Sequence, residues 1–148
     1  MKNNHFMERA LHQAKLAFEN NEVPVGAIIV EDGKIIAESH NKNISLKDPT
    51  AHAEILAIRQ ASLFKNSHRL DNCDIYITLE PCPMCASAIS LARVRRVYYA
   101  ASDQKFGGVE NGPRIFHSSS CHHRPEVYSG INEEESKELL TIYFKLKR

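Results

Sequence analysis

The chain has 148 residues, which suits one compact domain, and we expect that domain to occupy residues 1–148. Charged residues make up 25% of the sequence and hydrophobic residues 43%, which is ordinary for a globular domain and excludes a disordered or fibrous chain. The formal net charge of only +1 gives no support for a nucleic-acid partner, so such a partner has to be argued from local patches.

The N-terminus and the cysteines point to a reducing compartment. The first six residues lack the apolar run of a signal peptide, and no stretch approaches the roughly 20 apolar residues of a membrane span. We therefore expect a cytoplasmic protein without a membrane partner. Cys82 and Cys85 are close enough in sequence to share a metal, whereas Cys73 and Cys121 are expected to be ordinary free thiols.

The first elements expected along the chain are a helix and a hairpin. Apolar residues on one face predict a helix over residues 4–20. Two β-rich runs, 25–30 and 35–37, flank Asp32-Gly33 and predict a hairpin with a tight primed turn. Gly33 tolerates the positive φ that such a turn needs.

Two helices and a strand are expected in the middle of the chain. Thr50 follows a proline and is expected to cap a helix over residues 51–62. Residues 74–79 predict a strand. Residues 81–92 predict a short helix, whose first turn accommodates Pro83 because no backbone donor is lost there.

The last part of the chain completes an α/β pattern. Residues 96–100 predict a strand, a short last strand is expected around Tyr128, and residues 133–147 predict an amphipathic helix. Strands that alternate with helices indicate a sheet covered on both faces, and the early hairpin makes that sheet mixed. The expected fold is a three-layer α/β/α sandwich around a mixed central sheet of about five strands.

Two short motifs carry the chemistry, and each lies where a helix is expected to begin. Cys82 and Cys85 are three residues apart on one helix, so they can hold one ion, and the helix N-terminus favours their thiolates. His52 adds an imidazole. Two thiolates and one imidazole leave the fourth position of a tetrahedral zinc ion open for water, which is a catalytic arrangement, and sulfur ligands favour zinc over magnesium or calcium.

Glu54 lies two residues beyond His52, so both side chains can face the same site from one helical turn. We expect Glu54 to be the catalytic residue and not a ligand. It would take a proton from the attacking water and deliver protons to the ring nitrogen and the leaving amine of the substrate.

Two other interpretations of the cysteine pair remain open at this point. A Cys-x-x-Cys sequence can be a thioredoxin-like redox pair, but that interpretation gives no role to the His-x-Glu motif. A structural zinc site would need a fourth ligand, for which His117, His122 and His123 are candidates. The joint order of His-x-Glu, a strand and Pro-Cys-x-x-Cys favours the catalytic site.

This joint order resembles the cytidine and nucleobase deaminase superfamily, and within it the bacterial tRNA adenosine deaminases. The likeness runs essentially from end to end. Its strongest stretches are Glu22-Val-Pro-Val-Gly-Ala27, Asp48-Pro-Thr-Ala-His-Ala-Glu54, Thr78-Leu-Glu-Pro-Cys-Pro-Met-Cys85, Asp103-Gln-Lys-Phe-Gly107 and Arg124-Pro-Glu-Val127. The family usually shows Asn-His where this chain has His122-His123, and residues 109–120 match poorly.

The resemblance implies a cytidine deaminase-like fold, one Zn²⁺ per chain, a homodimer, and a tRNA anticodon stem-loop as substrate, whose wobble adenosine becomes inosine with release of ammonia. It also implies residue roles in substrate binding. These are a contact to the flipped base or its ribose by Asn41, lining of the base pocket by Val25, orientation of base and water by the backbone around Ala53 and Cys82, contacts to flanking nucleotides by Asp103 and Lys105, and packing near the anticodon loop by Phe144.

Two local clusters could support RNA binding without the family. One consists of Arg93, Arg95 and Arg96, and the other of Lys145, Lys147 and Arg148 beside Tyr143 and Phe144. Aromatic residues among cations suit stacking on unpaired bases. However, basic residues are common at helix C-termini, and both aromatic residues could belong to the core.

Two alternative functions share the metal motifs. One is a deaminase of a free base or nucleotide, such as guanine or cytosine, and the other is an RNA- or protein-binding module without turnover. The intact metal and proton-transfer residues argue against the module. The C-terminal cluster and residues 103–105 favour RNA over a free base.

Overall fold

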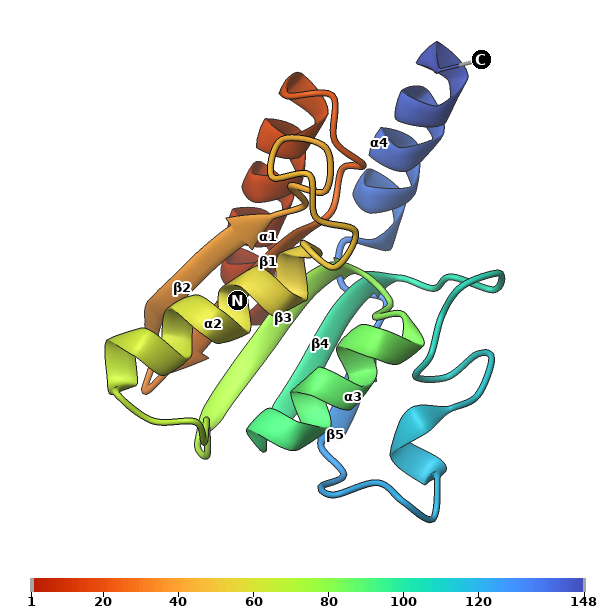
Figure 1. The fold of residues 1–148 in the computed structure, drawn as a ribbon. Helices are drawn as coiled ribbons and strands as arrows, with labels where there is room; N and C mark the ends of the chain where they lie inside the picture. Colours follow the sequence, from red (N-terminus) through yellow and green to blue (C-terminus); the bar gives the residue numbers. More distant parts are fainter. Residues whose placement is uncertain (1, 148) are drawn as a thin grey trace.

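A computed structural model describes the backbone of residues 2–147 and the side chains of residues 5–147 (Figure 1). The elements are helices α1 (Lys2–Glu19), α2 (Ala53–Lys65), α3 (Pro83–Ala92) and α4 (Glu133–Leu146), the 3-10 turn η1 (Ile115–His117), and strands β1 (Gly26–Glu31), β2 (Lys34–His40), β3 (Cys73–Leu79), β4 (Arg96–Ala101) and β5 (Glu126–Ser129). The predicted elements are therefore present in the predicted order. None of the helices within residues 2–147 is long and apolar enough to cross a bilayer.

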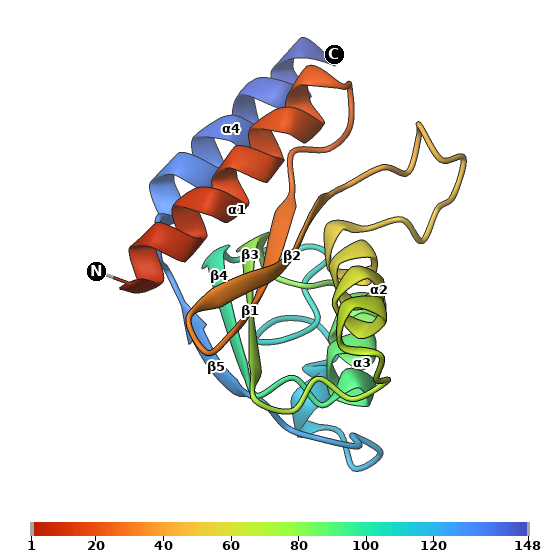
Figure 2. The same ribbon diagram turned by 90° about the vertical axis from the view of Figure 1, so that its left-hand side faces the viewer.

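The sheet is mixed and has five strands in the order β2-β1-β3-β4-β5. Strand β1 pairs antiparallel with β2 and β3, whereas β4 pairs parallel with both β3 and β5. Helices α1 and α4 lie side by side on one face, and α2 and α3 cover the other (Figure 2). The three-layer α/β/α sandwich expected from the sequence is confirmed.

The hairpin between β1 and β2 turns as its sequence predicts. Asp32 has φ 51° and Gly33 has φ 76°, and positive values at both central residues define a primed turn. The strand pairing shifts between Ile29 and Val30, where one extra residue of β2 forms a bulge.

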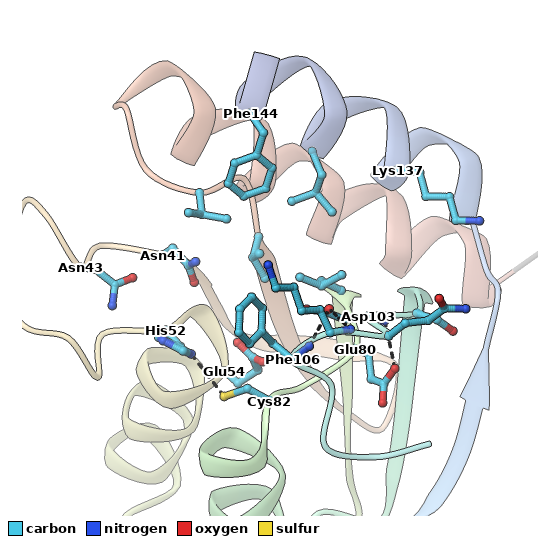
Figure 3. Close-up of a pocket in the computed structure, with 17 residues that line it drawn as sticks. Asn41, Asn43, His52, Glu54, Glu80, Cys82, Asp103, Phe106, Lys137 and Phe144 are labelled. Atoms are coloured by element: carbon cyan, nitrogen blue, oxygen red, sulfur yellow. Dashed lines mark hydrogen bonds between the residues drawn. The ribbon is translucent and has the colours of Figure 1, made fainter. Parts of the chain in front are cut away.

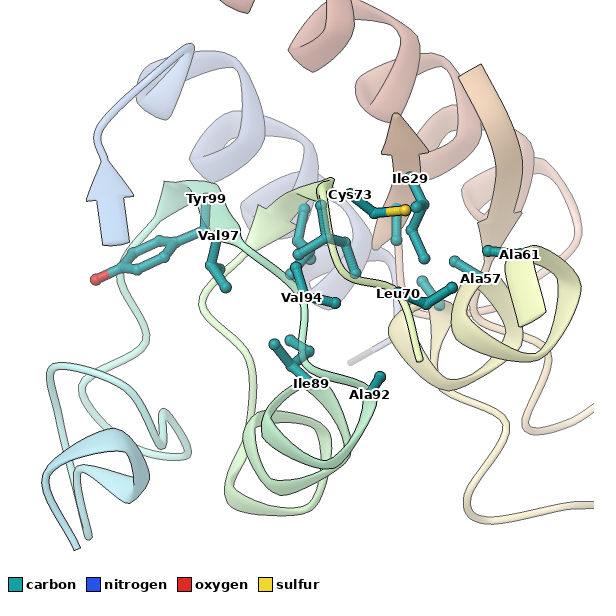
Figure 4. Close-up of a cluster of buried hydrophobic side chains, with 14 of the residues drawn as sticks. Ile29, Ala57, Ala61, Leu70, Cys73, Ile89, Ala92, Val94, Val97 and Tyr99 are labelled. Carbon is teal, nitrogen blue, oxygen red and sulfur yellow. The ribbon is translucent and has the colours of Figure 1, made fainter. Parts of the chain in front are cut away.

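Each face of the sheet has its own apolar core. Beneath α2 and α3, Ile75, Val97 and Tyr99 of the sheet pack with helix residues such as Ile89 (Figure 4). On the opposite face, the rings of Tyr76 and Tyr98 stack with centroids 4.4 Å apart. These packed layers hold the two helix starts that carry the motifs at one end of the sheet.

The predicted start of α2 was wrong. The helix begins at Ala53 with His52 as its N-cap, and it continues to Lys65. Thr50 does not cap it, because its N–H and hydroxyl both bind Asp48 Oδ1, at 2.8 and 2.7 Å. Helix α3 likewise begins at Pro83, with Cys82 as N-cap, two residues later than expected.

Candidate active site

His52 is the N-cap of α2, and Cys82 is the N-cap of α3. The two helices lie next to each other on one face of the sheet. His52 Nδ1 lies 3.6 Å from Cys82 Sγ and 3.4 Å from Cys85 Sγ. All three ligand atoms lie within 4.8 Å of one another. Tetrahedral zinc with bonds of about 2.05 Å to nitrogen and 2.3 Å to sulfur separates these atoms by about 3.5 Å, so the cluster fits zinc closely.

The pKa values of the two thiols are shifted in opposite directions. The hydrogen bond with Cys85, helped by one with His52, lowers the pKa of Cys82 to about 4 despite its burial. The same hydrogen bond, together with burial, raises the pKa of Cys85. The hydrogen bond with Cys82 also raises the pKa of His52. A cation bound among these atoms would displace the thiol protons and hold both sulfurs as thiolates.

Glu54 lies in the first turn of α2 beside this cluster, and only 4% of it is exposed. Burial is the main reason that the pKa of its carboxyl is raised, to about 7. Among the described residues, the cluster with ligand geometry consists of His52, Cys82 and Cys85, so Glu54 lies outside it. A carboxyl with this pKa is equally suited to accept and to donate a proton near neutral pH.

His52, Cys82 and Glu54 form part of the wall of a cavity of about 1050 Å³ (Figure 3). The lining also includes Val25, Asn41, Asp103, Lys105 and Phe144, which are five of the six residues predicted to bind substrate. The sixth, Ala53, is fully buried, and its N–H donates to Asn41 Oδ1 at 2.8 Å. The structure thus brings the predicted site residues together at one end of the sheet.

Glu80 is a buried residue that the sequence reasoning missed. Its carboxylate accepts hydrogen bonds from the backbone N–H groups of Asp103 at 3.0 Å and Val109 at 3.1 Å. It also accepts from the backbone of Glu110 and from the backbone and side chain of Asn111. Burial alone would raise the pKa of Glu80, but these hydrogen bonds outweigh it and the pKa lies below its ordinary value. Glu80 therefore fixes the loop 103–111 beside α3.

Glu22 fixes a loop on the opposite side of the cavity in the same way, and the sequence reasoning missed this residue too. It is 1% exposed, and its carboxylate accepts from the backbone N–H groups of Ile44 at 3.1 Å and Ser45 at 2.8 Å. A buried carboxylate needs such partners. In the sequence, Glu22 precedes strand β1 and Glu80 follows strand β3, and both glutamates lie within the motif stretches. The backbone N–H groups that bind their carboxylates, however, lie 22 or more residues away.

The two basic clusters predicted from the sequence have different surroundings in the structure, and the first of them is paired with acidic residues. Arg95 forms a paired hydrogen bond with Asp74, with both distances 3.0 Å, and Arg96 lies near Asp74 and Glu126, so these cations are already paired. Arg93 is the left-handed C-cap of α3. The first cluster is therefore accounted for within the fold.

In the C-terminal cluster, neighbouring aromatic residues have different places. Tyr143 is 7% exposed, packs against Phe18, and donates its hydroxyl to Asn21 O, so it belongs to the core. Phe144 is 49% exposed and lines the cavity. Arg148 lies outside the described residues.

The remaining histidines and cysteines are placed away from the cluster. His123 Nε2 lies 2.9 Å from Val94 O and its N–H donates to Ser90, so it fastens its loop to α3. Within residues 5–147, the metal-type cluster contains none of His117, His122 and His123. The three candidates for the fourth ligand of a structural zinc site therefore lie outside it. Cys73 and Cys121 are free thiols, as predicted.

The model of the cytidine and deoxycytidylate deaminase zinc-binding region matches residues 1–101. A tRNA-specific adenosine deaminase of Agrobacterium fabrum is 54% identical over 144 residues, covering 97% of this chain and 95% of that protein. The chain belongs to this family of zinc-binding deaminases. Its cofactor is accordingly zinc, for which the His-Cys-Cys cluster has the ligand types and spacing.

Other similar proteins are tRNA deaminases and a guanine deaminase. A tRNA-specific adenosine deaminase of Aquifex aeolicus is 46% identical, covering 97% of this chain and 95% of that protein. A solved structure from a study of A-to-I editing by tRNA:A34 deaminases is 55% identical with a TM-score of 0.91, covering 92% of this chain and 99% of that one. A guanine deaminase of Bacillus subtilis is 45% identical over 66% of this deaminase and 63% of that chain, with a TM-score of 0.64.

Proposed function

We propose that this protein deaminates the wobble adenosine of a tRNA anticodon to inosine by hydrolysis, with release of ammonia. The observation that carries the proposal is the near-complete, 46–54% identical match to proteins named tRNA-specific adenosine deaminase. The site is consistent with it, because a metal-type cluster and a buried carboxylate lie together in a cavity that is large enough for an extruded base.

In this proposal, His52, Cys82 and Cys85 hold one Zn²⁺ per chain. Their spacing fits tetrahedral zinc, and three protein ligands leave one position for a small molecule. The bound ion supplies Lewis-acid activation of water at neutral pH.

Glu54 is the proton carrier. Its carboxylate takes one proton from the attacking water while the oxygen adds to C6 of adenine, and it passes that proton to N1. It then takes the remaining proton of the new hydroxyl and delivers it to the amine at C6. Ammonia leaves as the C6–N bond breaks, the C6 carbonyl of inosine forms, and the Glu54 carboxylate is regenerated. Burial raises the pKa of this carboxyl toward neutrality, which favours its acting in both directions of proton transfer.

The walls of the cavity bind the substrate. Val25 contacts the base, and Asn41 offers its Nδ2 to the base or ribose because its Oδ1 is occupied by Ala53 N–H. Ala53 therefore acts through its backbone. Asp103 and Lys105 contact the flanking nucleotides, and Phe144 packs near the anticodon loop; all three residues line the cavity. An anticodon loop suits this arrangement because its unpaired bases are extruded at low cost.

The protein acts as a homodimer in the cytoplasm. Exposed apolar residues on α2 and α3 support a second copy as partner, since apolar groups of this kind mark interfaces. They are Leu63, Phe64, Met84 and Leu91. A reducing compartment is supported by the cysteine pair that serves as ligands.

The similarity to guanine deaminase makes a free base the alternative substrate. Ammonia release from an arginine tRNA, free guanine and free cytosine, measured with the same zinc-loaded enzyme, separates the two functions. We expect turnover of the tRNA and little of either base. Efficient turnover of a free base with an unchanged tRNA anticodon would overturn the proposal, and stoichiometric zinc without turnover of any substrate would indicate a binding module.

A further inference from the structure

Phe106 is an exposed aromatic residue at the rim of the cavity, and the roles proposed above do not use it. It lies on the loop that follows β4, it lines the cavity, and 64% of it is exposed. A large apolar side chain on a concave surface is the kind of group that a ligand covers.

Hydrogen bonds fix the loop backbone that carries this ring. Asp103 Oδ1 accepts hydrogen bonds from the N–H groups of Lys105 at 3.2 Å and Phe106 at 2.9 Å. Gly107 N–H donates to Asp103 O at 2.9 Å, so the backbone is tied on both sides of the ring. Buried Glu80 anchors Asp103 in turn, and a side chain at position 107 would collide with its carboxylate at 2.6 Å. The backbone that carries this ring therefore needs little further ordering when a flat partner binds.

The surroundings of the ring suit a nucleotide. Lys105 Nζ lies 5.3 Å from the centre of the Phe106 ring, and Lys137 also lines the cavity. Figure 3 shows Phe106 on the same side of the cavity as Asp103, with Phe144 above it and Glu54 below. An aromatic ring beside the Lys105 ammonium group fits an unpaired base together with its phosphate.

The position of the ring indicates which base it contacts. The reacting base must reach Glu54, which is only 4% exposed, whereas Phe106 is largely exposed at the rim. We propose that Phe106 is a stacking platform for an unpaired base next to the adenosine that enters the cavity, with Lys105 at the phosphate between the two nucleotides. This inference rests on the proposed function and adds Phe106 to it, as the residue that stacks on a flanking base.

The test is a double-mutant cycle on the full-length, zinc-loaded enzyme. The enzymes are wild type, Phe106→Ala, Phe106→Leu and Phe106→Tyr. The substrates are an anticodon stem-loop RNA and two versions in which the nucleotide 5′ or 3′ to the target adenosine is abasic. We expect Phe106→Ala to raise KM for the intact RNA by roughly 5- to 150-fold, the range for loss of one base–aromatic stack, with kcat changed less than about twofold. Phe106→Tyr should retain binding, whereas Phe106→Leu should not.

The coupling between the Phe106 substitution and the abasic position tests the stacking role. One abasic position should raise KM for wild type and have little further effect in Phe106→Ala, because the two changes remove the same contact. Additive effects at both positions, or a leucine variant as good as wild type, would overturn the stacking role. Wild-type turnover of the intact RNA reports on the proposed function separately. If the wild type does not deaminate that RNA, the proposed function fails and this inference fails with it.

Discussion

The side-chain oxygen of Asn41 accepts a hydrogen bond from the backbone N–H of Ala53 at 2.8 Å. This bond joins the segment after β2 to the first residue of α2, and it does so between His52 and Glu54. The helix has no side-chain cap of its own at His52, so Asn41 supplies the acceptor from 12 residues away. The bond therefore holds this part of the cavity wall and the first turn of α2 in one arrangement.

The oxygen and the nitrogen of the Asn41 amide have different proposed roles, and two mutations should distinguish them. Asn41→Ala removes the acceptor and should lower the free energy of unfolding by about 1 kcal/mol, the usual cost of a lost N-cap. Asn41→Asp keeps the acceptor but loses the donor, so it should retain most of the stability and still raise KM. Chemical denaturation and steady-state kinetics on the two variants measure both effects. Equal loss of stability in both variants would contradict the separation.

Glu54→Ala should keep zinc and lose nearly all turnover. Loss of a general acid–base group costs roughly 10²- to 10⁴-fold in rate, and this carboxylate performs both transfers. Zinc content by elemental analysis, together with kcat for a tRNA substrate, checks the prediction. Glu54→Gln, which keeps the size of the side chain, is the matched control for packing. If zinc is lost together with activity, Glu54 is a ligand or a structural residue.

Cys82→Ser and Cys85→Ser should weaken zinc binding. Each removes a ligand, so the loss of affinity should exceed the roughly 10- to 100-fold that follows removal of a ligand's hydrogen-bond partner. Competition with a chromogenic chelator measures the change. Cys121→Ser is the control, since that free thiol bonds to Ser90 and His123 outside the cluster. Undiminished affinity in either ligand variant would count against the site.

Phe144→Ala should weaken tRNA binding more than folding. The side chain is half exposed on the cavity wall, and surface substitutions of this kind usually change stability by less than about 0.5 kcal/mol. Loss of one stacking contact should weaken tRNA binding by roughly 5- to 150-fold. Tyr143→Phe is a useful comparison, because it removes only the hydroxyl that binds Asn21 O in the core. An equal loss of stability and of tRNA binding in Phe144→Ala would indicate that this residue has a structural role and not a binding role.

Local sequence was sufficient where one segment determines its own structure. Asp32-Gly33 specifies a turn with two positive φ values, and the spacing of Cys82 and Cys85 places both sulfurs at one helix start. The same kind of reasoning was wrong at Thr50, because Asp48 competes for its hydroxyl and N–H only two residues away.

Long-range partners could not be predicted in this way. The buried carboxylates of Glu22 and Glu80 depend on backbone donors more than 20 residues distant, and nothing in the local pattern identifies those donors. Periodicity also does not decide between Tyr143 and Phe144, since adjacent residues on a helix point in different directions and the partner surface selects one of them.

The most direct test of the central claim is incubation of the zinc-loaded protein with total tRNA, followed by sequencing for adenosine-to-inosine change. We expect inosine at the wobble position of one or a few tRNAs, and none in a parallel incubation with Glu54→Ala. Unchanged wobble adenosines with the wild-type protein, at full zinc occupancy, would contradict it.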